Sequence, residues 1–146
     1  MNIFQVIKEQ FNVPFATHTG VEITDVADGQ GTARMPQTET SINHIGSQHA
    51  GALFTLGEAA SGAAMAGAFA PVILEVRPIA GKAEIAYSKV AKGIITAHSR
   101  TLLPSTELLE KLNTDGKVAF DVAVDLTNAD GDQVAQMTVA WHVKKT

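Results

Sequence analysis

The chain has 146 residues and a formal net charge of −4 at pH 7, and 45% of its residues are hydrophobic against 18% that are charged. This balance is typical of a globular protein, and it excludes a disordered chain and the basic surface of a nucleic-acid-binding protein. The absence of cysteine excludes disulfides, zinc–thiolate sites and thiol nucleophiles. The length suits a single domain over residues 1–146.

The N-terminal segment predicts a short helix and then a β-hairpin. Apolar residues recur at helical spacing over residues 3–11, and Pro14 is expected to end that helix. Charged residues interrupt the apolar run, so a signal peptide is not expected. Residues 21–26 and 32–35 have the composition of two strands, with a glycine-containing turn between them.

A polar loop at residues 36–48 precedes the helix on which the functional argument depends. We predict this helix over residues 49–68, where thirteen of twenty residues are Ala, Gly or Ser, and Pro71 follows its end. The apolar segment is long enough to span a bilayer. However, it is dominated by Ala and Gly and carries Glu58 near its middle, which favours a helix buried against a sheet.

Four strands are predicted after the helix, at residues 79–90, 94–103, 118–126 and 134–143, with one helical turn at 108–112. The third of them alternates apolar and polar residues most regularly. The whole pattern predicts an α+β fold in which an antiparallel sheet of five or six strands wraps around one long central helix.

Two features of the central helix suggest chemistry. Burial is expected to raise the pKa of Glu58 and make its carboxylate available as a general base or a nucleophile. The alternative is a structural carboxylate within a dimer interface. At the start of the helix, Ala50 and Gly51 have little bulk, and their free N–H groups could stabilise an oxyanion.

These two features are too far apart for one chain to bring them together. His49 and Glu58 are nine residues apart, or about 13 Å along a helix. One reacting carbonyl cannot lie within about 3 Å of both groups, so a shared site would need two subunits. We therefore expect at least a homodimer, and pairing of strand edges between subunits would also cover the edge of the sheet.

The run from Asn43 to Ala60 resembles the signature of hotdog-fold acyl-CoA thioesterases, in particular the PaaI-like group and the uncharacterised DUF4442-like group. In these proteins an Asn precedes His-Gly-Gly, and an Asp or Glu follows the His by nine positions, as Glu58 follows His49. The resemblance implies a hotdog fold with Glu58 as the catalytic carboxylate. It also implies that Asn43 positions the water or the thioester, that the Ala50 N–H polarises the carbonyl, and that His49 supports the helix start.

The sequence departs from the family pattern at two points. The family usually has Gly at the position of Ala50, although Ala offers the same backbone N–H. Some relatives add a hydroxyl from a facing strand, and residues 72–78 contain no equivalent.

The segment from Tyr87 to Ala97 resembles the strand–turn–strand that borders the coenzyme A site in this family. Lys89, Lys92, Gly93 and Arg100 are the candidate residues for coenzyme A, which would enter as part of the substrate and not as a separate cofactor. Lysines that only solvate a strand are the alternative for these charges.

These observations predict a cytoplasmic acyl-CoA thioesterase that acts as a homodimer, with a dimer of dimers as a further assembly and with neither nucleic acid nor membrane as a partner. The alternative is a hotdog protein that binds acyl-CoA without hydrolysing it. His49 could instead serve only as a helix cap and Asn43 only as a turn residue. The histidines lack metal-ligand spacing, so no metal site is expected.

Overall fold

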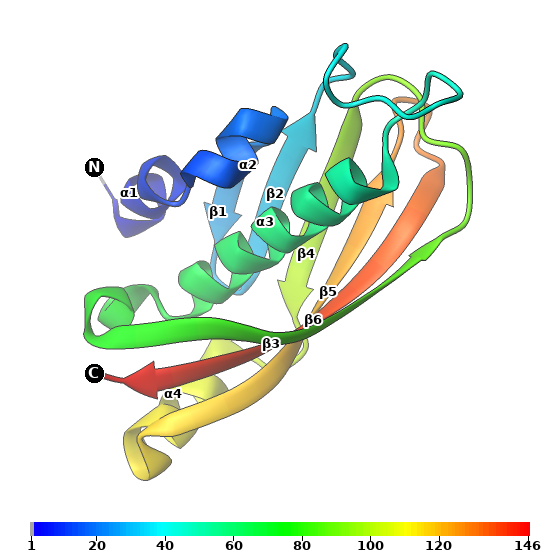
Figure 1. Cartoon of the computed structure of the whole chain (residues 1–146). Coiled ribbons are helices and arrows are strands. Elements are labelled where there is room, and N and C mark those ends of the chain that lie inside the picture. Colours follow the sequence, from blue (N-terminus) through cyan, green and yellow to red (C-terminus); the bar gives the residue numbers. More distant parts are fainter. Residues whose placement is uncertain (1) are drawn as a thin grey trace.

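The computed structural model describes residues 2–146 and shows a six-stranded antiparallel sheet curved around one long helix (Figure 1). The order of the strands across the sheet is β1-β2-β4-β5-β6-β3, and every neighbouring pair is antiparallel. The strands are β1 (Glu22–Ala27), β2 (Gln30–Met35), β3 (Val76–Tyr87), β4 (Ile95–Thr101), β5 (Lys117–Thr127) and β6 (Gln133–Lys145). The predicted α+β architecture is confirmed.

The central helix α3 (Ala50–Ala68) ends where the sequence predicts and starts one residue later than predicted, with His49 as its N-cap. Its small residues allow the sheet to approach the helix backbone. A Cβ atom added to Gly31 of β2 would lie 2.6 Å from the Ala63 Cβ and 2.8 Å from the Ala60 carbonyl oxygen. Only glycine therefore fits at this position of β2.

Two buried hydroxyl groups fasten α3 to the sheet. The Ser99 hydroxyl of β4 donates to the Ala60 carbonyl at 2.6 Å. The indole N–H of Trp141 in β6 donates to the Ser61 hydroxyl, which itself donates to the Glu58 carbonyl. The Glu58 carbonyl is thus linked through Ser61 to Trp141 of the sheet.

α1 (Ile3–Gln10) confirms the helix predicted at residues 3–11. The sequence pattern did not predict α2 (Pro14–Thr19) or the 3₁₀ helix η1 (Ala70–Glu75), and it predicted only one turn of α4 (Ser105–Asp115). Pro14 does not simply end a helix but starts the next one, at a first-turn position where its missing N–H has no cost. The predicted single turn at 108–112 is an eleven-residue helix, because Leu108 and Leu112 are both buried in the core.

β3 runs from Val76 to Tyr87, three residues earlier in the chain than predicted. It lies at the edge of the sheet and pairs with β6 on one side only, which explains how Pro78 is tolerated within it.

The loop predicted at residues 36–48 is confirmed, with one isolated bridge between Ile42 and Gln48. Within residues 2–146, no helix has the length and apolar character needed to cross a membrane.

Candidate active site

In the described part of the chain, the first turn of α3 leaves backbone N–H groups without hydrogen-bond partners, and the one that belongs to an exposed residue is that of Ala50. His49 has extended backbone angles (φ −66°, ψ 142°), and its Nδ1 accepts a hydrogen bond of 2.8 Å from the Gly51 N–H. The Gly51 N–H is therefore already used by the cap. The Ala50 N–H has no partner among residues 2–146, and both Ala50 and Gly51 are exposed. Of the two predicted N–H donors, only that of Ala50 is free to donate a hydrogen bond to an oxyanion in this arrangement.

Asn43 organises the loop in front of the helix start. Its side-chain oxygen accepts from the N–H groups of Ile45 and Ser47, both at 3.0 Å. Its side-chain nitrogen donates to the Ser47 hydroxyl at 2.8 Å and to the Gln48 carbonyl at 3.4 Å. The amide is thus satisfied within its own loop, which is the behaviour expected of a turn residue.

The loop at residues 36–48 and the segment after β3 lie near the start of α3 at one end of the molecule (Figure 1). A cavity of about 400 Å³ is lined by residues of these three segments. Asn43, Ala50, Leu53, Tyr87 and Lys89 are among the residues that line it. The fold therefore brings together the predicted loop, the predicted helix start and one predicted coenzyme A residue.

Tyr87 is one of the residues that line this cavity, and the sequence pattern predicted no individual role for it. Its hydroxyl donates a 2.9 Å hydrogen bond to the Ala50 carbonyl. A tyrosine hydroxyl is protonated and able to donate at neutral pH, and burial raises the pKa of Tyr87 further above its ordinary value of 10.0. The sequence pattern placed Tyr87 within a predicted strand at residues 79–90, but the partner of its hydroxyl is a main-chain atom 37 residues away, which no local pattern reveals.

Glu58 lies in the middle of α3, on the strip of the helix that the sheet leaves partly uncovered. The strip also includes Gly51, Phe54, Thr55 and Gly62, which are exposed or half-buried. Burial raises the pKa of the Glu58 carboxyl, as expected from the sequence. No salt bridge to this carboxylate is present in the part of the chain that the structure describes.

Glu58 does not line the cavity at the helix start. Because α3 is continuous, eight residues separate Ala50 from Glu58 by about 12 Å along the helix axis. A glutamate side chain cannot bridge that distance, so within one chain the Ala50 N–H and the Glu58 carboxylate cannot contact the same reacting carbonyl.

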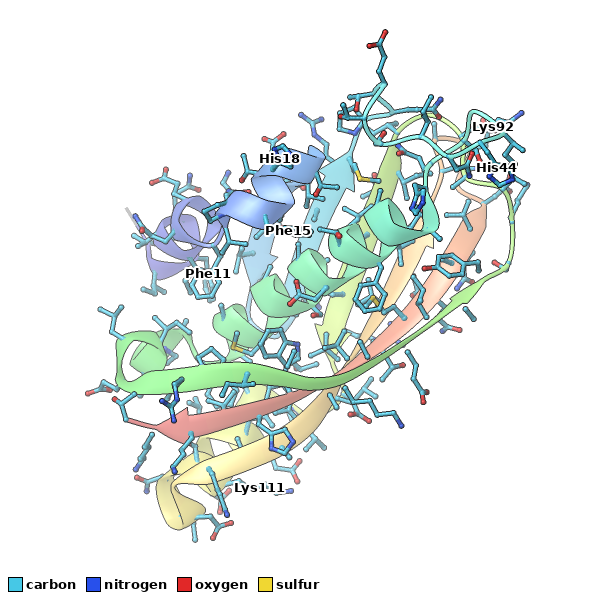
Figure 2. The ribbon with its side chains drawn as sticks, viewed as in Figure 1. Phe11, Phe15, His18, His44, Lys92 and Lys111 are labelled. Carbon is cyan, nitrogen blue, oxygen red and sulfur yellow. The ribbon has the colours of Figure 1, made fainter. Side chains whose placement is uncertain are left out.

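Of the predicted coenzyme A residues, three lie at the same end as the cavity. Lys89 is paired with Asp132 at 2.7 Å, and this ammonium lowers the pKa of Asp132. Lys92 is exposed and lines a second cavity of about 510 Å³ next to Lys89, and Figure 2 shows it at the end of the molecule where α3 begins. The Gly93 N–H donates to the Gln37 side chain at 2.8 Å, which joins the two loops.

The structure does not bring Arg100 to this group. Arg100 lies near the far end of β4, about 17 Å along the strand from Ile95, and it faces Asp125 at 3.5 Å.

Among residues 2–146, no three His, Asp or Glu side chains are placed to hold a metal ion.

Comparison with known proteins gives a family and a fold. The model of a domain of unknown function, DUF4442, matches residues 2–143. The chain is similar to PA5026 of Pseudomonas aeruginosa, a protein of unknown function described as a probable thioesterase. The identity is 26% over 97% of this chain and 95% of that chain, with a TM-score of 0.83. None of the curated proteins matches.

Two further solved structures share the fold at lower identity. One is a hypothetical thioesterase of Streptococcus pneumoniae with coenzyme A, at 22% identity over 94% of this chain and 97% of that chain, with a TM-score of 0.70. The other is the PaaI protein of the phenylacetic acid degradation operon of E. coli, at 19% identity over 87% and 86%, with a TM-score of 0.68. The family model spans nearly the whole chain, and these neighbours have the same sheet around a central helix. The chain therefore belongs to the DUF4442 family and has the hotdog fold of the thioesterase-type proteins.

Proposed function

We propose that the protein is an acyl-CoA thioesterase whose active site combines the start of α3 from one subunit with Glu58 from another. The observation that carries the proposal is the unpartnered Ala50 N–H beside a cavity, in a helix whose one carboxylate has a raised pKa. The coenzyme A bound to the Streptococcus pneumoniae neighbour supports a coenzyme A thioester as the substrate.

The chemistry follows from these groups. The thioester carbonyl would accept a hydrogen bond from the Ala50 N–H, strengthened by the positive end of the α3 dipole. The Glu58 carboxylate would remove a proton from the attacking water, and the tetrahedral oxyanion would then collapse and expel the thiolate of coenzyme A. Direct attack by Glu58 on the carbonyl is the other route open to the same carboxylate.

Other residues support the site in this proposal. Asn43 shapes the loop through its own hydrogen bonds, and His49 caps the helix. Lys89, Lys92 and Gly93 would lie along the coenzyme A portion of the substrate, because they line or adjoin the cavities at this end. Arg100 is left out of this group because of its position on β4.

Sharing between subunits is part of the proposal because of the distance of about 12 Å between Ala50 and Glu58 in one helix. A two-fold axis that places two α3 helices antiparallel would bring each Glu58 toward the helix start of the other subunit. The uncovered strip of α3 and the unpaired edge of β3 provide surface for such a contact.

The direct test uses Ala50→Pro, which removes the proposed donor and little else. Proline is favoured at the first helical position, and the extended backbone of His49 is compatible with a following proline. We expect kcat on short, long and aryl acyl-CoA substrates to fall by about 10²–10³-fold in this variant. Ala50→Gly, which keeps the N–H, is the control and should stay close to the wild type. A wild-type rate in Ala50→Pro would contradict the proposal.

Mixing two inactive variants tests whether the site is shared. Subunits with Ala50→Pro and subunits with Glu58→Gln would form hybrid dimers that contain one intact site each. Random exchange in equal amounts should restore about a quarter of the wild-type activity, since half of the dimers are hybrids. Failure to regain activity, with subunit exchange verified, would place both groups in one subunit's site.

Binding without hydrolysis is the second candidate. Residues 71–86 contain no hydroxyl side chain, so β3 before Tyr87 offers none of the hydroxyl groups that the resemblance assigns to some relatives. Coenzyme A binding by calorimetry, together with no thiol release from any acyl-CoA, would favour this candidate over the thioesterase.

A further inference from the structure

The peptide unit between Ala50 and Gly51 is held at both of its polar ends. Its carbonyl accepts the 2.9 Å hydrogen bond from the Tyr87 hydroxyl, and its N–H donates the 2.8 Å hydrogen bond to His49 Nδ1. The free Ala50 N–H immediately precedes this unit. We propose that Tyr87 is a positioning residue that fixes the direction of the Ala50 N–H; this inference rests on the thioesterase function proposed above.

Tyr87 is well anchored for such a role. It is the last residue of β3 and pairs with Ala135 of β6. The backbone stays attached to the sheet just beyond it, because the N–H groups of Ser88 and Lys89 both donate to the Val134 carbonyl, at 2.9 and 3.3 Å. The Tyr87 ring lines the cavity of about 400 Å³. Its hydroxyl therefore joins the helix start to the rigid edge of the sheet.

The first turn of α3 has few other restraints. The Thr55 hydroxyl donates to the Gly51 carbonyl from within the helix itself. Among residues 2–146, Tyr87 is the only residue outside α3 and its preceding loop whose side chain donates to the backbone of residues 50–53. Ala50 and Gly51 are exposed, and glycine gives the backbone additional freedom. Without Tyr87, the end of the helix would be free to fray.

The arrangement also polarises the site. Tyr87 donates to a carbonyl whose own peptide N–H donates to an imidazole nitrogen, so the two hydrogen bonds form a chain in which each strengthens the other. This chain requires that His49 Nδ1 carry no proton, because a protonated nitrogen could not accept. The result is a preorganised turn, and preorganised donors are what stabilises a developing oxyanion.

The test is Tyr87→Phe, which keeps the ring and removes the hydroxyl. We expect kcat to fall about tenfold, because a slightly misdirected donor loses transition-state stabilisation. The dissociation constant for coenzyme A alone should change less than about twofold, since the inference concerns the reacting carbonyl and not the coenzyme. Amide exchange followed by NMR should become faster at Gly51 and Leu53, whose N–H groups donate to His49, while the second half of α3 stays protected.

Ser99→Ala is the matched control, because it also removes a hydroxyl that donates to an α3 carbonyl, at Ala60. It should lower the stability of the fold and leave kcat close to the wild type. Equal loss of kcat in both variants would overturn the inference, and so would an unchanged kcat in Tyr87→Phe. A wild-type protein that hydrolyses no acyl-CoA would overturn the proposed function itself, whereas normal turnover in Tyr87→Phe would overturn only the role of Tyr87.

Discussion

The indole N–H of Trp141 donates a 3.1 Å hydrogen bond to the buried Ser61 hydroxyl, and thereby joins the last strand to the central helix one turn from Glu58. Both side chains are almost completely buried. The hydroxyl in turn donates to the Glu58 carbonyl at 2.7 Å. Together with the buried hydrogen bond from Ser99 to the Ala60 carbonyl, this polar contact helps to set the position of the helix on the sheet.

Ser61→Ala should destabilise the protein by about 1–3 kcal/mol, because it leaves the Trp141 N–H buried without an acceptor. Trp141 is the single tryptophan, so its fluorescence in urea unfolding reports this region directly. In the Trp141→Phe background no indole N–H is left unpaired, so Ser61→Ala should lower the free energy of unfolding clearly less. Because this background has no tryptophan, its unfolding is followed by circular dichroism. Equal costs in both backgrounds would show that the hydrogen bond contributes nothing.

Glu58→Gln should stabilise the fold at neutral pH while abolishing hydrolysis. Burial raises the pKa of Glu58 above its ordinary value of 4.5. The folded state therefore binds a proton more tightly than the unfolded state, and stability falls as pH rises from 4.5 through the raised pKa. The free energy of unfolding of Glu58→Gln should accordingly exceed that of the wild type at pH 7, and the difference should diminish as the pH approaches 4.5.

Urea unfolding over a pH series measures this gain, and Glu110→Gln on the exposed surface of α4 controls for the loss of one charge. In the wild type, kcat/KM should fall on the acid side at a pH above 4.5, since only the ionised carboxylate acts as a base. A wild type more stable than Glu58→Gln at pH 7 would indicate a structural ion pair across a dimer interface instead.

Substitutions of His49 separate its two suggested roles. His49→Ala should cost about 1 kcal/mol of stability, because the Gly51 N–H loses its cap, whereas Asn is a favourable N-cap and should retain most of it. If capping is the whole role, His49→Asn should keep kcat near the wild-type value. A large and equal loss of kcat in both variants would show that the imidazole contacts the substrate.

Two glycines of α3 should respond in opposite directions to alanine. At Gly67 a Cβ atom would collide with the carbonyl of Ala27, the last residue of β1, so Gly67→Ala should destabilise by roughly 3 kcal/mol or more. At Gly62 the nearest atom to an added Cβ is 3.7 Å away, on the Trp141 ring. Gly62→Ala should therefore gain about 0.5–1 kcal/mol from helix propensity. Thermal unfolding measures both, and similar changes in the two variants would contradict this packing.

The sequence predicted the elements whose signals are local. The composition of residues 49–68 predicted a helix that a sheet approaches closely, and Gly31 against Ala63 shows this contact. α2 was missed because a proline can follow the end of one helix or begin the next, and Pro14 begins α2. The extent of α4 was missed because it depends on burial of Leu108 and Leu112, which no local pattern reveals.

The candidate site divides in the same way. The cap at His49 and the raised pKa of Glu58 follow from residue type and position, so they could be anticipated. The bond from Tyr87 to the Ala50 carbonyl could not, because it joins a side chain to a main-chain atom across the fold. Arg100 was included for its charge, but the register of β4 carries it away from the cavity.

The free donor at the start of α3 belongs to the main chain, and this affects how the protein tolerates genetic change. Nineteen of the twenty amino acids supply the same N–H at position 50, and only proline withholds it. For the proposed reaction, position 50 would therefore be constrained by side-chain size and by the exclusion of proline, and Ala and Gly would supply the same donor. A full substitution library at this codon should show one inactive member for the loss of hydrogen bonding and a graded loss with increasing bulk.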